Sequence, residues 1–400
     1  MNACSLLHDV IENACPNIHK KRLVTLQLAV KTLCFNPQAS LSALGRAWLS
    51  PVDTKHCIKR MDRLLGNTRL HAERVSVYRA VLPLLIARQQ RPVLIVDWSQ
   101  INEEAGFHIL RASLASQGRA LTVYEEVHPQ RLSHNRRVHG AFLRQLKAMM
   151  PEGVTPILVT DAGFKNPWFR QVEAQGWYWM GRIRHTTLFR AHDQDGWRAC
   201  RSLNDFASET PQSLGDITLT KSNPIRCAAY LYKKALQGRK KTTQGKRKSQ
   251  RKNSTAYGQR EREPWFLVTN LPGLSAKQAV KMYRTRMQIE ESFRDSKNQR
   301  IGLSLKESRS RNEERLQILL LIVALATLTL WLIGSLARQR GREKGYQANT
   351  EKRKAVLSTF NLGMQVLRKE GMPETERETL LALMAAIPVI IEEIYQEDRF

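Results

Sequence analysis

The chain has 400 residues, and its 64 Lys or Arg against 36 Asp or Glu give a formal net charge of +28. An apolar fraction of 42% is ordinary for a globular protein and excludes a chain that is disordered throughout. A basic excess of this size indicates a polyanionic partner, and nucleic acid is the one we expect. A merely basic, soluble protein is the alternative.

The six cysteines are scattered and form no Cys-x-x-Cys pair, so the sequence does not support a zinc ribbon or a redox motif. A disulfide framework is not expected at this length, which is consistent with a reducing compartment. The N-terminal segment carries acidic residues and lacks the apolar stretch of a signal peptide. We therefore expect a cytoplasmic protein.

Residues 1–90 predict a helical DNA-binding domain. Apolar residues recur at helical spacing over 21–35, a short helix is expected over 41–49, and a helix with one basic and one apolar side follows over 54–67. Helix, turn and basic helix in succession are typical of a DNA-binding head. The alternative is a small helical bundle without a ligand. The basic residues that favour DNA are Lys55, His56, Lys59, Arg60 and Arg63.

Residues 91–185 predict the first part of an α/β catalytic core, and residues 263–336 predict its second part. The first part reads as strands at 93–98, 107–114, 119–127, 155–161 and 177–184, with helices at 136–150 and 168–177. The second part begins with a strand at 265–271 and a long helix at 277–300. This order predicts a mixed sheet with helices on its faces.

Between the two parts, residues 186–262 predict an inserted β subdomain with a basic loop. The run 233–263 holds twelve Lys or Arg and only two acids, which is typical of a solvated loop that becomes ordered on nucleic acid. Residues 337–400 predict a C-terminal helical region with dimer or partner contacts as its candidate role.

One segment, residues 318–336, has 19 residues and no charge. It therefore meets the length criterion for a transmembrane helix. The alternative is a central helix that is buried on all sides. We expect the buried helix and no membrane partner, because no other segment is of this kind and polar chain continues on both sides.

Two predicted strands run into an aspartate. The apolar residues 93–96 lead to Asp97, and residues 157–160 lead to Asp161. Ligands gather outside the carboxyl ends of strands in α/β sheets, so parallel neighbours would place the two carboxylates side by side. Adjacent carboxylates repel unless a cation lies between them, and oxygen ligands suit Mg²⁺ or Mn²⁺. Two aspartates that merely begin loops are the alternative.

A third carboxylate lies on the predicted helix 277–300. Tyr283, Arg286, Glu290 and Lys297 have the offsets of one helix face, whereas the neighbouring acids point elsewhere. With two aspartates, Glu290 could hold two divalent ions that act on a phosphodiester. Arg286 and Lys297 would neutralise a phosphate, and Tyr283 could donate to it. A solvated face with salt bridges along the helix is the alternative.

The set Asp97, Asp161 and Glu290 on this order of strands resembles the bacterial insertion-sequence DDE transposases, which have a ribonuclease-H-like catalytic domain. The spacing Y-x2-R-x3-E-x6-K is similar to the signature of the transposon-ten and transposon-five branch, insertion-sequence family four. The segments 94–99, 159–169 and 263–272 also resemble that branch. The resemblance spans about residues 5–370 and implies a ribonuclease-H-like mixed five-stranded sheet with an inserted β subdomain and helical regions at both ends.

The resemblance implies cut-and-paste DNA transposition in the bacterial cytoplasm, at the nucleoid. Its steps are end binding, strand nicking, hairpin formation and resolution, and strand transfer, with two Mg²⁺ ions for which Mn²⁺ can substitute. It implies double-stranded DNA partners, namely terminal inverted repeats and target DNA, and a homodimer in the synaptic complex. It assigns Trp265 to stacking on a flipped base, with a core Trp as the alternative. A related metal-dependent nuclease and a non-catalytic DNA-binding regulator remain alternatives for the whole chain.

Overall fold

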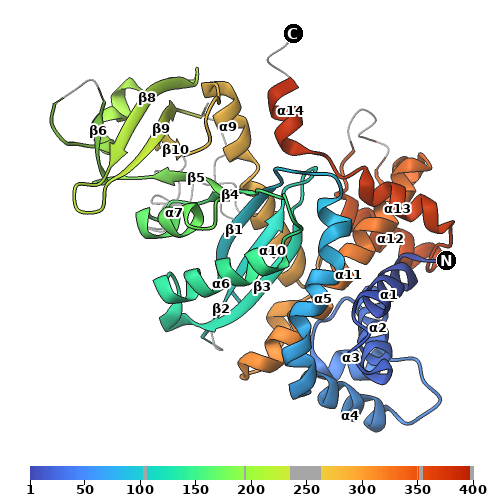
Figure 1. The fold of residues 1–400 in the computed structure, drawn as a ribbon. Coiled ribbons are helices and arrows are strands. Elements are labelled where there is room, and N and C mark those ends of the chain that lie inside the picture. Colours follow the sequence, from blue (N-terminus) through green and yellow to red (C-terminus); the bar gives the residue numbers. More distant parts are fainter. Residues whose placement is uncertain (102–105, 193–194, 235–262, 349, 351–354, 397–400) are drawn as a thin grey trace, which may run out of the picture. The chain divides into compact units, whose positions relative to one another are not determined.

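The computed structural model describes residues 1–400 except 102–105, 193–194, 235–262, 349, 351–354 and 397–400 (Figure 1). The chain forms two compact units by its internal contacts. The first unit combines residues 1–154 with 287–390, and the second combines residues 155–286 with 391–400. Both units contain helices and strands, so the mixed α/β class expected from the sequence is confirmed. The five-part division along the chain stays a prediction.

The first unit is rich in helices. Five of them cover the N-terminal segment: α1 (Ala3–Ala14), α2 (Lys20–Phe35), α3 (Leu41–Ala47), α4 (Thr54–Leu65) and α5 (Thr68–Ile86). The others are α6 (Arg136–Met149), α10 (Met287–Lys297), α11 (Glu313–Gln339), α12 (Thr359–Glu370) and α13 (Arg377–Ala385), with 3₁₀ turns η1 (Gln130–Leu132), η3 (Leu305–Glu307) and η4 (Arg342–Tyr346). Many begin where a short polar side chain accepts from the first-turn backbone, as Asn67 does for α5 and Asn135 for α6.

The apolar segment 318–336 forms most of α11, the central helix of the first unit. By length and composition α11 could cross a membrane, but 89% of its most apolar 18-residue window is buried inside the protein. It packs against α1, α2, α5 and α12. A Cβ on Gly334 would lie 1.9 Å from the carbonyl oxygen of Thr359, so α11 and α12 meet backbone to backbone. This burial favours the core-helix interpretation.

Three strands form the sheet of the first unit: β1 (Val93–Gln100), β2 (Phe107–Leu114) and β3 (Leu121–Pro129). They run in the order β3-β2-β1, and both pairs are antiparallel. The predicted strand 93–98 is two residues too short at its carboxyl end, because β1 continues to Gln100 in register with β2. Asp97 therefore lies within the ladder, where its direct cross-strand partner is Arg111.

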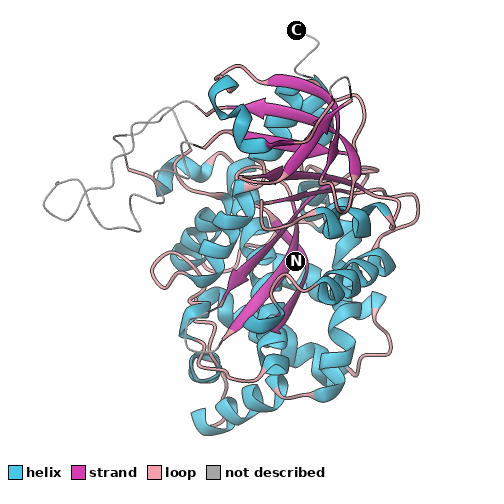
Figure 2. Ribbon diagram, turned by 90° about the vertical axis from the view of Figure 1, so that its left-hand side faces the viewer, coloured by secondary structure: helices cyan, strands magenta, loops and turns pink. Residues whose placement is uncertain are grey.

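The second unit contains the remaining described strands in the order β4-β5-β10-β9-β8-β6-β7. Their bounds are β4 (Ile157–Thr160), β5 (Tyr178–Ile183), β6 (Leu188–Ala191), β7 (Arg198–Ala199), β8 (Gln212–Leu219), β9 (Ile225–Tyr232) and β10 (Trp265–Thr269). Strands β4 and β5 are parallel, and β10 is antiparallel to both β5 and β9. Of the inserted strands, β9 is hydrogen-bonded to the core strand β10, and β8, β6 and β7 extend the sheet from β9 (Figures 1 and 2).

The helical elements of the second unit are α7 (Asn166–Glu173), η2 (Cys200–Phe206), α9 (Ala276–Arg284) and, apart from its first residue, α14 (Ile390–Gln396). The basic run 233–263 lies outside the described residues except at its two ends.

The predicted long helix 277–300 is interrupted. Helix α9 ends at Arg284 and α10 begins at Met287. At the break, the N–H groups of Thr285 and Arg286 donate to carbonyls three residues back, each at 3.1 Å, instead of the four of an α-helix. The boundary between the two units also falls here, after Arg286. The prediction of one continuous helix is therefore wrong.

Candidate active site

Asp97 is half-buried in the middle of β1. The four apolar residues before it, Val93 to Val96, are buried and anchor the strand in the core. One oxygen of its carboxylate, Oδ1, accepts the N–H of Trp98 at 2.8 Å, which restricts the side chain. The strand thus presents the carboxylate from a rigid element.

Asp161 follows β4 directly, as the sequence predicts. Its Oδ1 accepts the N–H of Gly163 at 2.8 Å, so the aspartate closes a turn through its own side chain. It is half-buried. Asp161 belongs to the second unit, whereas Asp97 and Glu290 belong to the first. That these carboxylates lie side by side stays a prediction.

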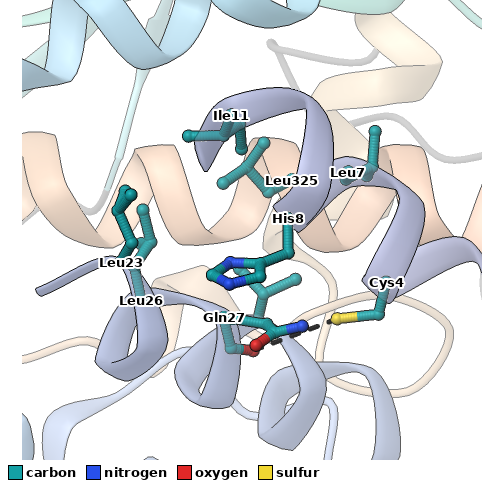
Figure 3. Close-up of a pocket in the computed structure, with 9 residues that line it drawn as sticks. Cys4, Leu7, His8, Ile11, Leu23, Leu26, Gln27 and Leu325 are labelled. Atoms are coloured by element: carbon teal, nitrogen blue, oxygen red, sulfur yellow. Dashed lines mark hydrogen bonds between the residues drawn. The ribbon is translucent and has the colours of Figure 1, made fainter. Parts of the chain in front are cut away.

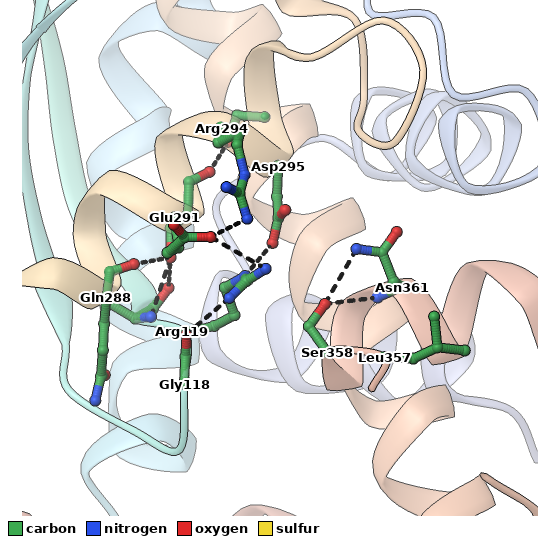
Figure 4. Close-up of polar contacts among 12 residues, drawn as sticks. Gly118, Arg119, Gln288, Glu291, Arg294, Asp295, Leu357, Ser358 and Asn361 are labelled. Atoms are coloured by element: carbon green, nitrogen blue, oxygen red, sulfur yellow. Dashed lines mark hydrogen bonds and ion pairs between the residues drawn. The ribbon is translucent and has the colours of Figure 1, made fainter. Parts of the chain in front are cut away.

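Glu290 lies in the first turn of α10 and is exposed. The nearby acids have structural partners, as Figure 4 shows. Arg119 pairs with Asp295 at 2.5 Å and with Glu291 at 3.4 Å, and Arg294 also contacts Glu291. These ion pairs engage two of the three acids of α10 within the fold, whereas Glu290 is presented at the surface.

Lys297, at the end of α10, is held against β1. Its Nζ donates to the hydroxyl of Ser99 at 2.6 Å and to the carbonyl of Gln100. The pKa of Lys297 is lowered to about 7, first by burial and then by the charges of Arg111 and Lys306, while Asp97 opposes the shift. The side chain is 9% exposed. The ammonium of Lys297 is therefore hydrogen-bonded within the protein, near Asp97.

The second unit holds the other predicted DNA-contacting residues. Trp265 opens β10 and is half-buried, with its ring centroid 5.0 Å from that of Tyr283 and 5.6 Å from that of Tyr232. The pKa of Tyr283 is raised to about 12, because the effect of burial outweighs the opposing charges of Arg286 and Arg182. The same group feels the charge of Asp161. An aromatic edge, arginines and a carboxylate therefore occur together in this unit.

The predicted metal ligands fit a hard divalent cation by their chemistry, because all three donors are carboxylates. Among the residues that the structure describes, no three His, Cys, Asp or Glu side chains form a group that could hold a metal ion. The three carboxylates are divided between the two units, two in the first and one in the second. The chemistry of the donors therefore fits the metal, and the assembly of the three carboxylates into one site stays a prediction.

Sequence reasoning missed two charged residues that follow Asp97 across the neighbouring strands β2 and β3. Arg111 and Glu125 form a fully buried ion pair at 2.7 Å, with side chains 1% and 0% exposed. Their signal was a charge in the middle of an otherwise apolar strand, as in FHILRASL. It also missed His139, whose Nε2 accepts the indole N–H of Trp98 at 2.9 Å. A lone histidine in α6 gives no such signal.

The basic helix α4 presents its charges unevenly. Lys55, His56, Lys59 and Arg63 are exposed, and Cys57, Met61, Leu64 and Leu65 face the interior. Arg60 is exposed as well, but its guanidinium lies over the ring of Trp48, 4.6 Å from the centroid, and donates to Thr25 at 3.2 Å. Of the five basic residues expected to face DNA, Arg60 has a packing role.

A small pocket lies among α1, α2 and α11 (Figure 3). Its lining is mostly aliphatic, and its polar groups include Cys4, His8 and Gln27. Cys4 Sγ lies 4.0 Å from the carbonyl oxygen of Gln27, and burial raises the pKa of this thiol to about 11. Because the thiol stays protonated and the lining is mostly aliphatic, we interpret this pocket as a packing gap in the helical core.

Comparisons with known proteins give one family. A family model described as "Transposase DDE domain" matches residues 88–327, more than half of the chain. No curated protein matches. Among solved structures, the chain is similar to the piggyBac transposase in its synaptic complex with hairpin DNA, with a TM-score of 0.39 and 10% identity over 98% of this chain and 81% of that one. The last similarity is too weak to bear on the fold.

Proposed function

The chain belongs to the DDE transposase family, and on that premise we propose that it catalyses cut-and-paste transposition of a bacterial insertion sequence of the transposon-ten type. DDE transposase domains act on DNA with divalent metal ions. The proposal adds the complete reaction: end binding, nicking, hairpin formation and resolution, and strand transfer. The observation that supports this proposal is the contact between β1 and α10. It brings Lys297 close enough to Asp97 for their charges to interact, while Glu290 on the same helix stays exposed.

Asp97, Asp161 and Glu290 would hold two Mg²⁺ ions, for which Mn²⁺ can substitute. When bound, such ions supply an activated water or 3′-hydroxyl and stabilise the leaving oxygen of the phosphodiester. The chain's own contribution is to place these carboxylates. β1 fixes Asp97 through its ladder, a side-chain turn fixes Asp161, and the first turn of α10 presents Glu290 at the surface.

Tyr283, Arg286 and Lys297 would hold DNA phosphate near the cleavage point. The boundary between the two units lies between α9 and α10, directly after Arg286. Tyr283 and Arg286 therefore belong to the second unit and Lys297 to the first. The ammonium of Lys297 is hydrogen-bonded to Ser99 and Gln100. When DNA binds, Lys297 would either exchange these partners for a phosphate or keep them and attract the phosphate by its charge. Arg286 can contact a phosphate through two parallel hydrogen bonds.

Trp265 would stack on a base that is flipped out of the duplex when the hairpin forms. Its position at the first residue of β10 leaves the ring half-buried, and Tyr232 and Tyr283 support it edge-on. Aromatic stacking with a base contributes about 1–3 kcal/mol. A ring that is held from two sides loses little further freedom on binding, which favours this role over a wholly buried core Trp.

The N-terminal helices would bind the terminal inverted repeats through the exposed basic face of α4. We further propose a homodimer in the synaptic complex and a location at the bacterial nucleoid in the cytoplasm. A basic face of this kind reads DNA from the major groove when its helix follows a turn.

The test uses DNA that flanks the gene, searched for short inverted repeats and joined into a linear substrate. Purified protein with Mg²⁺ should give double-length hairpin strands on a denaturing gel, and Asp97→Ala should give none. Cleaved ends without hairpins or joined products would favour the related nuclease. Binding without cleavage in Mg²⁺ and in Mn²⁺ would favour the regulator.

A further inference from the structure

The sheet of the first unit carries a row of charges that includes Asp97. Asp97 on β1 is directly opposite Arg111 on β2, and Arg111 is directly opposite Glu125 on β3. Residues directly opposite one another on neighbouring antiparallel strands share a face, with Cβ atoms about 4.5–5.5 Å apart. Carboxylate, guanidinium and carboxylate therefore follow one another across a single face of the sheet.

Helix α10 covers this face. The guanidinium of Arg111 lies 4.5 Å from the ring centroid of Phe293, and its Nη1 is 3.5 Å from the hydroxyl of Ser296. The ammonium of Lys297 lies 5.0 Å from the same ring. Helix α10 thus covers Arg111, Tyr78 of α5 reaches Glu125, and only the Asp97 end of the row is half-exposed.

A contribution to the stability of the fold does not by itself explain why such a buried ion pair is present. Removing two charges from water costs several kcal/mol, and an apolar pair of similar volume is often as stable or more stable. The pair has one close ion contact, between Nε of Arg111 and Oε2 of Glu125 at 2.7 Å, and Tyr78 adds a longer bond to Glu125 at 3.4 Å. Because the row of charges ends on Asp97, the pair can act on that carboxylate.

We propose that the Arg111–Glu125 pair is the charge-balancing element of the metal centre to which Asp97 belongs. Arg111 attracts and orients the Asp97 carboxylate. Glu125 cancels enough of the guanidinium charge for the centre to keep its affinity for a divalent cation. Both are positioning residues, since neither contacts the metal or the DNA, and the inference rests on the proposed role of Asp97 as a metal ligand.

The first variant is Glu125→Gln, which keeps the shape and removes one negative charge. Mn²⁺ binding is measured directly, by electron paramagnetic resonance of the free ion, on the full chain bound to a pre-cleaved transposon end. The uncompensated Arg111 should weaken Mn²⁺ binding about tenfold, the order expected for a partly screened charge within about 10 Å. The matched control is Glu73→Gln, because Glu73 also pairs with an arginine, Arg22, but lies on α5. It should leave the affinity within about twofold.

The second variant, Arg111→Met with Glu125→Met, keeps the net charge and replaces the pair by apolar side chains that can pack in its place. We expect it to fold and to bind transposon ends like the wild type, and to cleave at least about tenfold more slowly because Asp97 has lost its orienting charge. Wild-type cleavage by this double variant, or equal Mn²⁺ affinities for the two Glu→Gln variants, would overturn the inference. Asp97→Asn separates the two proposals: unchanged Mn²⁺ binding there would refute Asp97 as a ligand.

Discussion

Lys297 donates a hydrogen bond from Nζ to the hydroxyl of Ser99 at 2.6 Å, two residues beyond Asp97 on the same strand. This bond ties the end of α10 to β1. It connects the last residue of the four-residue signature to the strand of the first predicted ligand. The ammonium is almost fully buried, so the contact has a consequence for the pH dependence of stability.

Replacing Lys297 by Met should change that pH dependence. The pKa of Lys297 is lowered from 10.5 to about 7, so below pH 7 both the folded and the unfolded protein carry the charge and folding buries it. Between about pH 7 and 10.5 the unfolded chain binds more protons, and wild-type stability rises with pH. From pH 7.5 to 9.5 the wild type should gain about 2 kcal/mol relative to Lys297→Met in urea unfolding. Parallel pH curves for the two proteins would contradict the lowered pKa.

How far the sequence could predict the fold depends on whether a feature is local. The strands around Asp97 and Asp161 follow from apolar runs and turn residues, which are properties of neighbouring residues. The break after Arg284 could not be predicted, because the helical spacing of 277–300 continues through it and the tightening of the turn is a tertiary effect. For the same reason, the sequence could not predict that β1 continues to Gln100.

The candidate site shows the same division. Spacing alone singled out Tyr283, Arg286, Glu290 and Lys297. That Lys297 is buried against Ser99, and that Arg111 lies opposite Asp97, are matters of strand register and helix packing. One sequence gives no register between strands that lie far apart along the chain, so a charged residue inside an apolar strand can be noticed but not assigned a partner.

Substituting any one of the three predicted metal ligands by Ala should abolish cleavage and leave end binding largely intact. Each carboxylate would contribute to the metals, whereas the basic face of α4 would contribute to end binding. Gel-shift assays with the transposon end and denaturing gels with Mg²⁺ measure the two properties separately. Cleavage by Glu290→Ala would refute the third ligand, and Glu291→Ala is the neighbouring control, since Glu291 pairs with Arg119 and Arg294.

Replacing His139 by Gln should flatten the acid side of the stability curve. Burial, with help from His134 and His128, lowers the pKa of His139 from 6.5 to about 4. Between these values the unfolded chain binds more protons, so stability that is present at pH 7 is lost as the pH falls toward 4. The variant should lose less stability than the wild type over this range, by up to about 3 kcal/mol in urea unfolding. Equal losses would show that His139 titrates normally.

Trp265→Ala should separate hairpin formation from nicking. If the ring stacks on a flipped base, its removal costs the hairpin step about 1–3 kcal/mol, or roughly 5- to 150-fold in rate, while the first nick needs no flipped base. A time course on a denaturing gel resolves nicked strands from hairpins. Trp179→Phe is the control, because Trp179 is buried against Phe169 in a stack with 4.1 Å between ring centroids. Equal slowing of nicking and hairpin formation by Trp265→Ala would indicate a core role instead.

Lys59→Ala should weaken binding to the transposon end and also lower its salt dependence. Lys59 lies on the exposed face of α4, and each phosphate contact that is lost reduces the slope of log K against log salt by about 1.

Arg60→Ala is the matched control one residue along. The guanidinium of Arg60 packs on Trp48 and Thr25, so this change should reduce stability and leave the salt slope unchanged. Fluorescence anisotropy with end DNA between 50 and 200 mM salt, about the range over which such contacts are felt, measures both slopes. A lower slope for Arg60→Ala than for Lys59→Ala would mean that the helix meets DNA through a different face.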